Sequence, residues 1–248
     1  MAEHAQTSRR LAGKIAVVTG SSSSGIGKAI ALTFAREGAS VVVAARRARL
    51  CEAVAAKIRD GGGEASPVPT DVTDETQVDG LIRETVTRYG RLDILVNNAG
   101  IVGGGKIGDL GTKPFDDIIN TNLRGMFFCC RAGFRQMKKQ KTGGTIINMS
   151  SVAGVQAWAG TGAYSASKHG VMALTKSLAD EGRPFKIKSM AICPGGVADE
   201  LVDAPPKDIE RSEKISPFDI AETALYLATL GPHAVVHQVI VDRMGADW

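Results

Sequence analysis

Short apolar runs alternate with longer amphipathic segments along almost the whole chain. The apolar runs are rich in β-branched residues, and they cover residues 14–19, 40–45, 65–69, 92–96, 145–149, 186–193 and 235–241. Their length and composition predict strands, and their lack of polar alternation predicts burial on both faces. Apolar positions recur at helical spacing in residues 26–37, 50–59, 75–89, 114–139, 164–178 and 217–230. This alternation predicts an α/β fold, a doubly wound (Rossmann) parallel sheet of seven strands with helices on both faces.

The domain organisation follows from length and from the evenness of the pattern. The 248 residues suit one large α/β domain, and no composition break or linker divides them. We therefore expect a single domain over residues 11–248, preceded by a flexible tail at residues 1–10. The segment from Glu200 to Ser216 is short and charged, which suggests an open pocket beside it.

Charge and composition exclude several classes of partner. The net charge of +4 comes from scattered lysines and arginines, which is too thin for a nucleic-acid groove. No apolar run reaches membrane-spanning length, and the N-terminus has no apolar signal core, so no membrane association is expected. The four cysteines show no C-x-x-C spacing, which is typical of reduced thiols in a cytoplasmic protein. His233 and His237 carry no recognisable metal spacing, and no metal site is predicted.

A glycine-rich turn follows the first predicted strand. Gly20, Gly25 and Gly27 lie between that strand and the first helix, with four serines between the first two glycines. Glycines at this place let the backbone approach a pyrophosphate, whose charge suits a helix N-terminus. Any tight strand-to-helix turn can need glycines, but three of them directly after an apolar strand favour dinucleotide binding.

A hydroxyl, a phenol and an ammonium are expected to converge after the fifth strand. Ser151 stands at the strand's end, and Tyr164 and Lys168 share one helix face because they are four residues apart. Lowering the pKa of a phenol from about 10 to near neutrality takes roughly 4 kcal/mol, which an ammonium about 4 Å away can supply. The spacing thus indicates a proton shuttle at Tyr164, tuned by Lys168, with Ser151 holding a substrate oxygen. Taken alone, the same spacing also occurs between surface neighbours.

Several motifs, in order, resemble those of the short-chain dehydrogenase/reductase family over nearly all of residues 11–248. They are TGSSSSGIG at 19–27, NNAG at 97–100, NTNLRG at 120–125, Ser151 with Tyr164 and Lys168, and CPGGV at 193–197. The resemblance implies an oxidoreductase that transfers hydride between a nicotinamide dinucleotide and a ketone or secondary alcohol. It also implies a homo-oligomer, a tetramer or a dimer, packed through the helices that start near Pro114 and Thr161.

The resemblance also implies a role for each matching residue. Tyr164 is the general acid or base, Lys168 lowers its pKa and binds the nicotinamide ribose, and Ser151 polarises the substrate carbonyl. Asn122 holds a water that links Lys168 to solvent, although a turn-capping role fits it equally. The residues expected to contact the dinucleotide are Gly20, Ser22, Ser23, Ser24, Gly25, Ile26, Gly27, Arg46, Arg47, Asp71, Val72, Asn98, Ala99, Gly100, Tyr164, Lys168, Pro194, Gly195 and Val197. Asp71 can instead cap a helix.

Two positions depart from the family's pattern. The turn has one residue more than usual between Gly20 and Gly25. After Pro194 and Gly195, where the family commonly has a threonine that grips the nicotinamide carboxamide, this chain has Asp199. An aspartate accepts from the amide but cannot donate, and its charge could favour the oxidised ring.

The end of the second strand bears on which dinucleotide is used. Ala45 stands where NAD-preferring relatives carry an aspartate that binds the adenosine ribose, and Arg46 and Arg47 follow it. A guanidinium suits bidentate contact with a 2′-phosphate, so NADP(H) is expected over NAD(H). The alternative is that both arginines begin a solvated helix.

The functional prediction is an NADP(H)-dependent carbonyl reductase or 3-oxoacyl-reductase-like enzyme. The competing class is a dinucleotide-binding regulatory or scaffolding protein without turnover. The extra serine and Asp199 favour that alternative, whereas the complete set of Ser151, Tyr164, Lys168 and Asn122 argues against it.

Overall fold

Seven strands form one parallel sheet at the centre of the molecule. The computed structural model describes residues 9–22, 24–205, 207–208 and 212–245. The strands are β1 (Ile15–Thr19), β2 (Ser40–Ala45), β3 (Glu64–Pro69), β4 (Ile94–Asn97), β5 (Gly144–Met149), β6 (Ile187–Pro194) and β7 (Gln238–Val241). Their order across the sheet is β3-β2-β1-β4-β5-β6-β7, so the chain runs outward from β1 to one edge and then outward from β4 to the other. The predicted doubly wound fold is confirmed.

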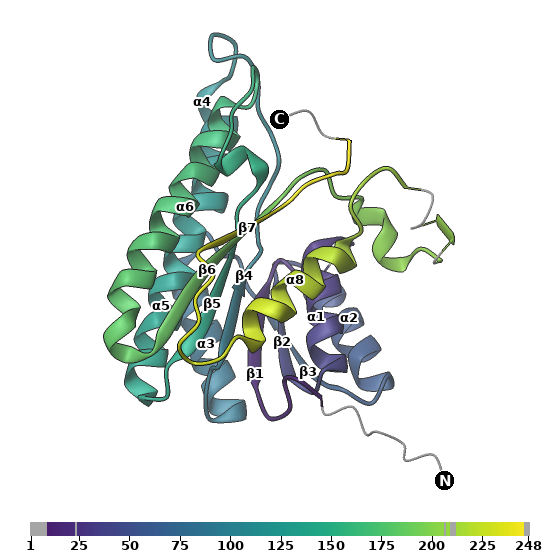
Figure 1. Ribbon diagram of the computed structural model, residues 1–248, viewed down its shortest axis with the longest axis vertical. Helices are drawn as coiled ribbons and strands as arrows, with labels where there is room; N and C mark the ends of the chain where they lie inside the picture. Colours follow the sequence, from purple (N-terminus) through teal and green to yellow (C-terminus); the bar gives the residue numbers. More distant parts are fainter. Residues whose placement is uncertain (1–8, 23, 206, 209–211, 246–248) are drawn as a thin grey trace.

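Helices cover both faces of this sheet (Figure 1). One face carries α1 (Ile26–Arg36), α2 (Ala48–Asp60) and α8 (Pro217–Thr229). The other carries α3 (Glu75–Tyr89), α4 (Thr112–Ile119), α5 (Met126–Gln140) and α6 (Gly162–Gly182). Short helical turns η1 (Asn120–Gly125), η2 (Val152–Gly154), η3 (Arg183–Phe185) and η4 (Asp199–Asp203) lie between the main elements.

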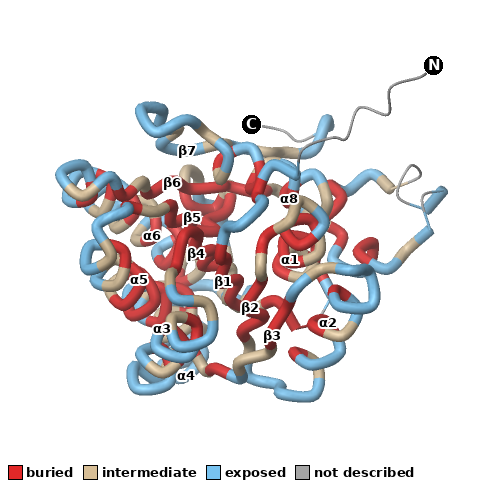
Figure 2. The backbone as a smooth tube through the Cα atoms, turned by 90° about the horizontal axis from the view of Figure 1, so that it is seen from below, coloured by how far each residue is buried: buried red, intermediate tan, exposed pale blue. Residues whose placement is uncertain are grey.

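The apolar strands bury side chains on both faces and so divide the core into two layers. All five residues of β1 are buried, and alternate members enter different layers: Ala16 and Val18 pack with α1 and α8, whereas Val17 packs with α3 and α5. The burial view shows the strands as the inner layer of the molecule (Figure 2). Unbroken apolar runs therefore reflect burial from two sides, as a helix-covered parallel sheet requires.

Local signals fix where several helices begin and end. The Asp74 carboxylate accepts hydrogen bonds from the amides of Thr76 and Gln77 at 2.9 and 3.2 Å, so it caps α3. At the start of α8 Ser216 and Asp219 form a reciprocal capping box.

The predicted continuous helix over residues 114–139 is wrong. The structure divides this stretch into α4, a π-helical turn over Asn120–Gly125, and α5. A π turn adds a residue to one helical turn, which apolar periodicity does not reveal. The last strand is also shorter than predicted, because only Gln238–Val241 pairs with β6.

Part of the charged segment after β6 is packed against the helices. Leu201 and Val202 are buried, and the Asp203 carboxylate pairs with Lys28 on α1 at 2.6 Å and with Lys57 on α2 at 3.1 Å. Asp203 therefore ties this segment to α1 and α2.

Two further observations concern the ends and the surface. Residues 1–8 of the predicted tail lie outside the described residues, while Arg10 pairs with Glu37 and Glu222 at 3.0 and 3.3 Å. Among the helices that the structure describes, none combines the length and apolar character needed to cross a bilayer.

Candidate active site

A cavity of about 380 Å³ opens where the strands end, between the turns that follow β1, β2, β4, β5 and β6. The described residues that line it include Gly20, Ser22, Ser24, Ile26, Ala45, Arg46, Arg47, Thr70, Asp71, Val72, Asn98, Ala99, Gly100, Ile101, Val102, Thr121, Met149, Ser150, Ser151, Tyr164, Lys168, Pro194, Gly195, Val197 and Asp199. In open α/β sheets ligands bind at this edge, where the strand order reverses between β1 and β4.

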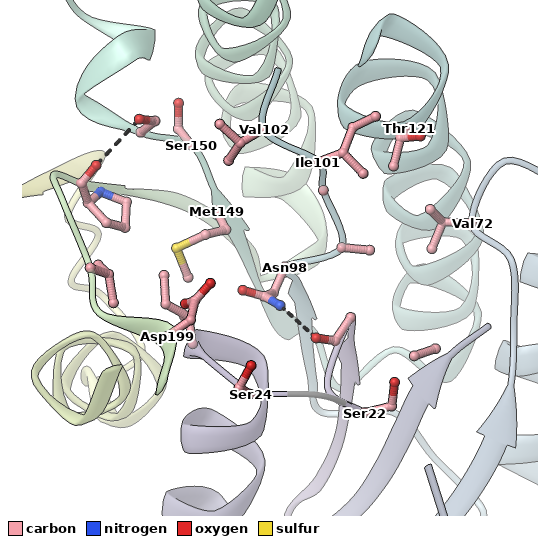
Figure 3. Close-up of a pocket in the computed structure, with 18 of the residues that line it drawn as sticks. Ser22, Ser24, Val72, Asn98, Ile101, Val102, Thr121, Met149, Ser150 and Asp199 are labelled. Atoms are coloured by element: carbon pink, nitrogen blue, oxygen red, sulfur yellow. Dashed lines mark hydrogen bonds between the residues drawn. The ribbon is translucent and has the colours of Figure 1, made fainter. Parts of the chain in front are cut away.

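One side of the cavity, here called the cofactor wall, consists of Gly20, Ser22, Ser24, Ile26 and residues 45–47. Gly20 has φ 67°, and a Cβ there would lie 2.7 Å from the Cα of Ala99. The Asn98 side-chain amide donates to the carbonyl of Gly20 at 3.1 Å, which ties the turn after β1 to the loop after β4 (Figure 3). Glycine at position 20 is thus required by both the backbone angle and the close approach.

The serines of the turn differ in their surroundings. Ser21 is buried, and its hydroxyl donates to the carbonyl of Val18 at 2.7 Å. Ser22 is also buried and lines the cavity, whereas Ser24 is exposed at the rim. Ser23, predicted to contact the cofactor, lies outside the described residues.

The cofactor wall fits a dinucleotide phosphate. Helix α1 starts at Ile26, which lines the cavity, and no described side chain caps its N-terminus at Gly25. The first amides of a helix without a side-chain cap are free to donate to an anion, and the helix dipole adds attraction. Gly27 lies behind the turn, where a Cβ would come within 3.0 Å of the carbonyl carbon of Gly20.

The opposite side, here called the catalytic wall, consists of Ser151, Tyr164 and Lys168, with Asn122 behind them. Ser151 follows β5, and its hydroxyl oxygen accepts from the amide of Ala153 at 3.1 Å. Lys168 lies on α6 with 5% of its surface exposed, and its ammonium donates to the carbonyl of Met149 at 2.9 Å. Its Nζ is 5.7 Å from the centroid of the Tyr164 ring. The predicted convergence of hydroxyl, phenol and ammonium is therefore present in the structure.

Burial controls the protonation of this group. Burial raises the pKa of the Tyr164 phenol, and the hydrogen bond with Ser151 lowers it by less. Burial also lowers the pKa of Lys168 to about 8. The net shift of the Tyr164 pKa is thus upward, because loss of solvent outweighs the hydrogen bond with Ser151. The role of Lys168 in lowering that pKa stays a prediction.

Asn122 lies behind the cavity and not on its surface. Its side-chain amide donates to the carbonyl of Ile101 at 2.9 Å and to the Ser167 hydroxyl at 3.2 Å, and its oxygen accepts from the Ile101 amide at 2.8 Å. A Cβ on Gly100 would lie 3.2 Å from that oxygen and 3.7 Å from the Lys168 ammonium. The π-helical turn therefore places Asn122 next to Lys168, where its side chain holds the loop after β4.

Two arginine side chains that follow β2 lie beside the cavity. Arg46 and Arg47 are exposed and line it, and no carboxylate in the described part of the chain forms an ion pair with either. Asp71 also lines the cavity, and its Oδ1 accepts from the amide and the hydroxyl of Thr73 at 3.0 and 2.8 Å. Its carboxylate thus shapes the turn that leads to α3.

Most of the predicted site residues meet at this cavity. The exceptions are Gly25 and Gly27, which support the turn from behind, Asn122, and the undescribed Ser23. The structure adds Ala45, Thr70, Ile101, Val102, Thr121, Met149, Ser150 and Asp199 to the lining. Several of these follow directly after a strand, and that position in a parallel sheet was the available signal. Trp158, in the loop between Ser151 and Tyr164, is 48% exposed and is not among the described lining residues.

Comparison with known proteins now decides the family. The family model described as short chain dehydrogenase matches residues 14–209. The chain belongs to the short-chain dehydrogenase family. Members of this family are oxidoreductases that act on CH–OH and C=O groups with a nicotinamide dinucleotide.

Relatives of this short-chain dehydrogenase include enzymes with named reactions. A 3beta-hydroxysteroid dehydrogenase of Mediterraneibacter gnavus is 41% identical over 79% of this chain and 71% of that protein. A 3-oxoacyl-[acyl-carrier-protein] reductase of Staphylococcus aureus is 37% identical over 87% of this chain and 91% of that protein. A short-chain type dehydrogenase/reductase of Mycobacterium marinum superposes with a TM-score of 0.85 at 35% identity, covering 95% of this chain and 96% of the other.

Proposed function

We propose that this short-chain dehydrogenase interconverts a ketone and a secondary alcohol with NADP(H). The observation that carries the proposal is the catalytic wall, where Tyr164 and the buried Lys168 share a cavity with Ser151. The cofactor, when bound along the opposite wall, supplies or accepts the hydride. The protein then has to orient the carbonyl and move one proton.

Each residue of the catalytic wall has a role in that proton transfer. Tyr164 donates its phenolic proton to the oxygen of a ketone, because its raised pKa keeps it protonated at neutral pH. The Ser151 hydroxyl donates a hydrogen bond to the same oxygen and fixes its position. Lys168 holds the ribose of the cofactor and faces Tyr164, while Asn122 keeps the surrounding loop in place.

The choice of NADP(H) rests on the end of β2. Ala45 leaves no carboxylate that would repel a 2′-phosphate, and Arg46 and Arg47 offer two guanidinium groups without ion pairs in the described part of the chain. One such charge-assisted contact is worth roughly 1.5–3 kcal/mol, or about ten- to a hundredfold in preference. The double variant Ala45→Asp with Arg46→Ala is expected to reverse the preference. Equal kcat/KM for both cofactors in the native protein would contradict it.

The substrate is proposed to carry its carbonyl on an apolar body. Val102 lines the cavity and is 86% exposed, and Ile107 on the same loop is 88% exposed. Both named relatives act, by their names, on a hydroxysteroid or a 3-oxoacyl group, each of which has an apolar skeleton. A 3-oxoacyl-reductase-like or carbonyl reductase reaction fits this rim.

The alternative of a binding protein without turnover is not favoured, since the catalytic wall is complete. Loss of NADPH absorbance with a panel of apolar ketones tests the choice, and NADH run in parallel tests the cofactor. Turnover that Tyr164→Phe abolishes supports the enzyme. Tight NADPH binding with no turnover of any ketone, or of any secondary alcohol with NADP⁺, would favour the alternative.

The assembly is proposed to be a homo-oligomer in the cytoplasm. An apolar groove of about 330 Å³ lies between α5 and α6, and Phe127 beside it is 42% exposed. All four cysteines are free and buried, which fits a reducing compartment. Light scattering of Phe127→Glu against the native protein tests the interface. An unchanged mass for the variant would contradict it.

A further inference from the structure

Asp199 lies where the phosphates of a dinucleotide are expected to bind. It lines the cavity, and Figure 3 shows it beside Ser24 and below Met149, on the cavity side of the glycine-rich turn. A Cβ built on Gly25 would lie 2.7 Å from the Asp199 carboxyl carbon and 3.3 Å from its Cβ. The carboxylate is thus in contact with the first residue before α1, the helix whose N-terminus faces the cavity.

The backbone on both sides of Asp199 is firmly held. Before it, the amide of Ala198 donates to the carbonyl of Ile215 at 3.0 Å, and Ala198 is buried. After it, Leu201 and Val202 are buried, and Asp203 pairs with Lys28 and Lys57 at 2.6 and 3.1 Å. The backbone on either side of Asp199 therefore holds its carboxylate next to Gly25.

The charges around Asp199 do not neutralise it fully. Lys28 on α1 and Lys57 on α2 are paired with Asp203, and Lys214 lies 3.9 Å from Glu200. The positive charges that still attract the Asp199 carboxylate are Lys214 and the partial charge at the N-terminus of α1. Those same helix amides are the donors for a pyrophosphate, so the carboxylate and the phosphates compete for one positive region.

We propose that Asp199 is a determinant of cofactor affinity whose carboxylate opposes the pyrophosphate and weakens the oxidised and reduced dinucleotides equally. The inference goes beyond the proposed function, since it depends on neither the substrate nor the choice between NADP(H) and NAD(H). It differs from an effect on the nicotinamide ring, which would favour the cationic oxidised form over the reduced one. Both forms carry the same pyrophosphate, so the two explanations predict different ratios.

Protonation of the Asp199 carboxylate should remove its repulsion of the pyrophosphate. Partial burial, followed by repulsion from Glu200, raises the pKa of the Asp199 carboxyl, while Lys214 acts in the opposite direction. Below that raised pKa the side chain is neutral, so the native protein should bind dinucleotide more tightly as pH falls towards it. An asparagine at this position has no charge to lose and should not contribute this pH dependence.

The test is a titration of native protein, Asp199→Asn and Glu200→Gln with NADP⁺, NADPH and NAD⁺. Binding is measured by calorimetry and, for NADPH, also by the fluorescence of the cofactor. Asp199→Asn is expected to tighten all three by about five- to twentyfold at neutral pH, as one removed charge a few ångströms from a phosphate allows. Glu200→Gln removes the same charge one residue away, outside the described lining, and should change affinity by less than about twofold. Repeating the titration from about pH 5 to about pH 8 should show an affinity difference between native protein and Asp199→Asn that grows with pH. NAD⁺ lacks the 2′-phosphate, which itself titrates in this range, and so controls for that group.

The outcomes separate this proposal from the proposed function. Native protein that binds dinucleotide no more weakly than Asp199→Asn overturns the role of Asp199 and leaves the enzyme intact. A variant that tightens NADPH but weakens NADP⁺ also overturns it, in favour of contact with the ring. An equal gain in Glu200→Gln would reduce the effect to general surface charge and overturn it likewise. If neither the native protein nor the Asp199→Asn variant binds any dinucleotide, both the proposal and the enzymatic function fail.

Discussion

The two walls of the cavity are built in different ways. On the catalytic wall Tyr164 is half-buried, and the other functional side chains are buried with protein partners: Lys168 donates to the Met149 carbonyl, and Asn122 is fully buried with three hydrogen bonds. On the cofactor wall the arginines are exposed, and the turn after β1 leads into the N-terminus of α1, which no described side chain caps. The fold thus fixes side-chain positions on one side and backbone positions on the other.

This difference predicts how each wall responds to substitution. A buried side chain that takes part in the chemistry has no substitute, so changes on the catalytic wall should reduce the rate by orders of magnitude. Backbone amides survive side-chain changes, so changes on the cofactor wall should shift affinity or selectivity by smaller factors. The following experiments test this contrast from the largest expected effect to the smallest.

Tyr164→Phe should produce the largest loss. The ring is retained and only the transferable proton is removed, so kcat should fall by about a thousandfold or more while dinucleotide affinity stays within about threefold. Steady-state kinetics together with cofactor titration measure both quantities. Tyr226→Phe, an exposed tyrosine on α8, is the control and should change neither. A near-native kcat in Tyr164→Phe would sink the proposed proton transfer.

Lys168→Ala should lower both the rate of catalysis and the affinity for the dinucleotide. The ammonium faces Tyr164 and is proposed to hold the cofactor ribose, so kcat should fall by about a hundredfold and dinucleotide affinity by about tenfold. The matched control is Lys176→Ala, two turns further along α6, whose ammonium pairs with Asp180 at 2.7 Å near the surface. Unchanged cofactor affinity in Lys168→Ala would remove the ribose role from this residue.

The difference between the walls also explains what the sequence could predict. The strands and the edge at which they end follow from apolar runs, and the four-residue spacing puts Tyr164 and Lys168 on one helix face. Spacing does not report burial, so the upward shift that burial gives the pKa of Tyr164 could not be read from the sequence. The π turn at Asn120–Gly125 was missed because its extra residue leaves no mark in apolar periodicity.

Ion pairs between residues far apart in the sequence could not be predicted from local sequence patterns either. Asp203 is 175 residues from Lys28 and 146 residues from Lys57, and these contacts tie the charged segment after β6 to α1 and α2. The position of Asp199 over Gly25 depends on that anchoring. The sequence identifies Asp199 as unusual, and only the fold places it beside Gly25 in the lining of the cavity.

The pH dependence of reduction should follow Lys168. Burial sets its pKa at about 8, below the ordinary 10.5, so the ammonium is present below that pH and is lost as pH rises through it. If the ammonium is needed, kcat/KM for the reduced cofactor should be level below about pH 8 and fall about tenfold for each further unit. The residual activity of Lys168→Ala should lack this break. A profile that stays level to about pH 10 would show that the charge on Lys168 is not required.

Shortening the glycine-rich turn by one serine should have the smallest effect. Deleting any one of Ser21–Ser24 gives the same sequence, so a serine remains to bond the Val18 carbonyl as Ser21 does at 2.7 Å. Because backbone amides bind the phosphates, dinucleotide affinity should stay within about threefold in a fluorescence titration. Gly20→Ala is the contrasting variant: at φ 67° its Cβ would lie 2.7 Å from the Ala99 Cα, so binding should be lost. Loss of binding in a folded, shortened protein would instead mean that the extra residue shapes the phosphate site, and the cofactor wall would then depend on its side chains as strictly as the catalytic wall does.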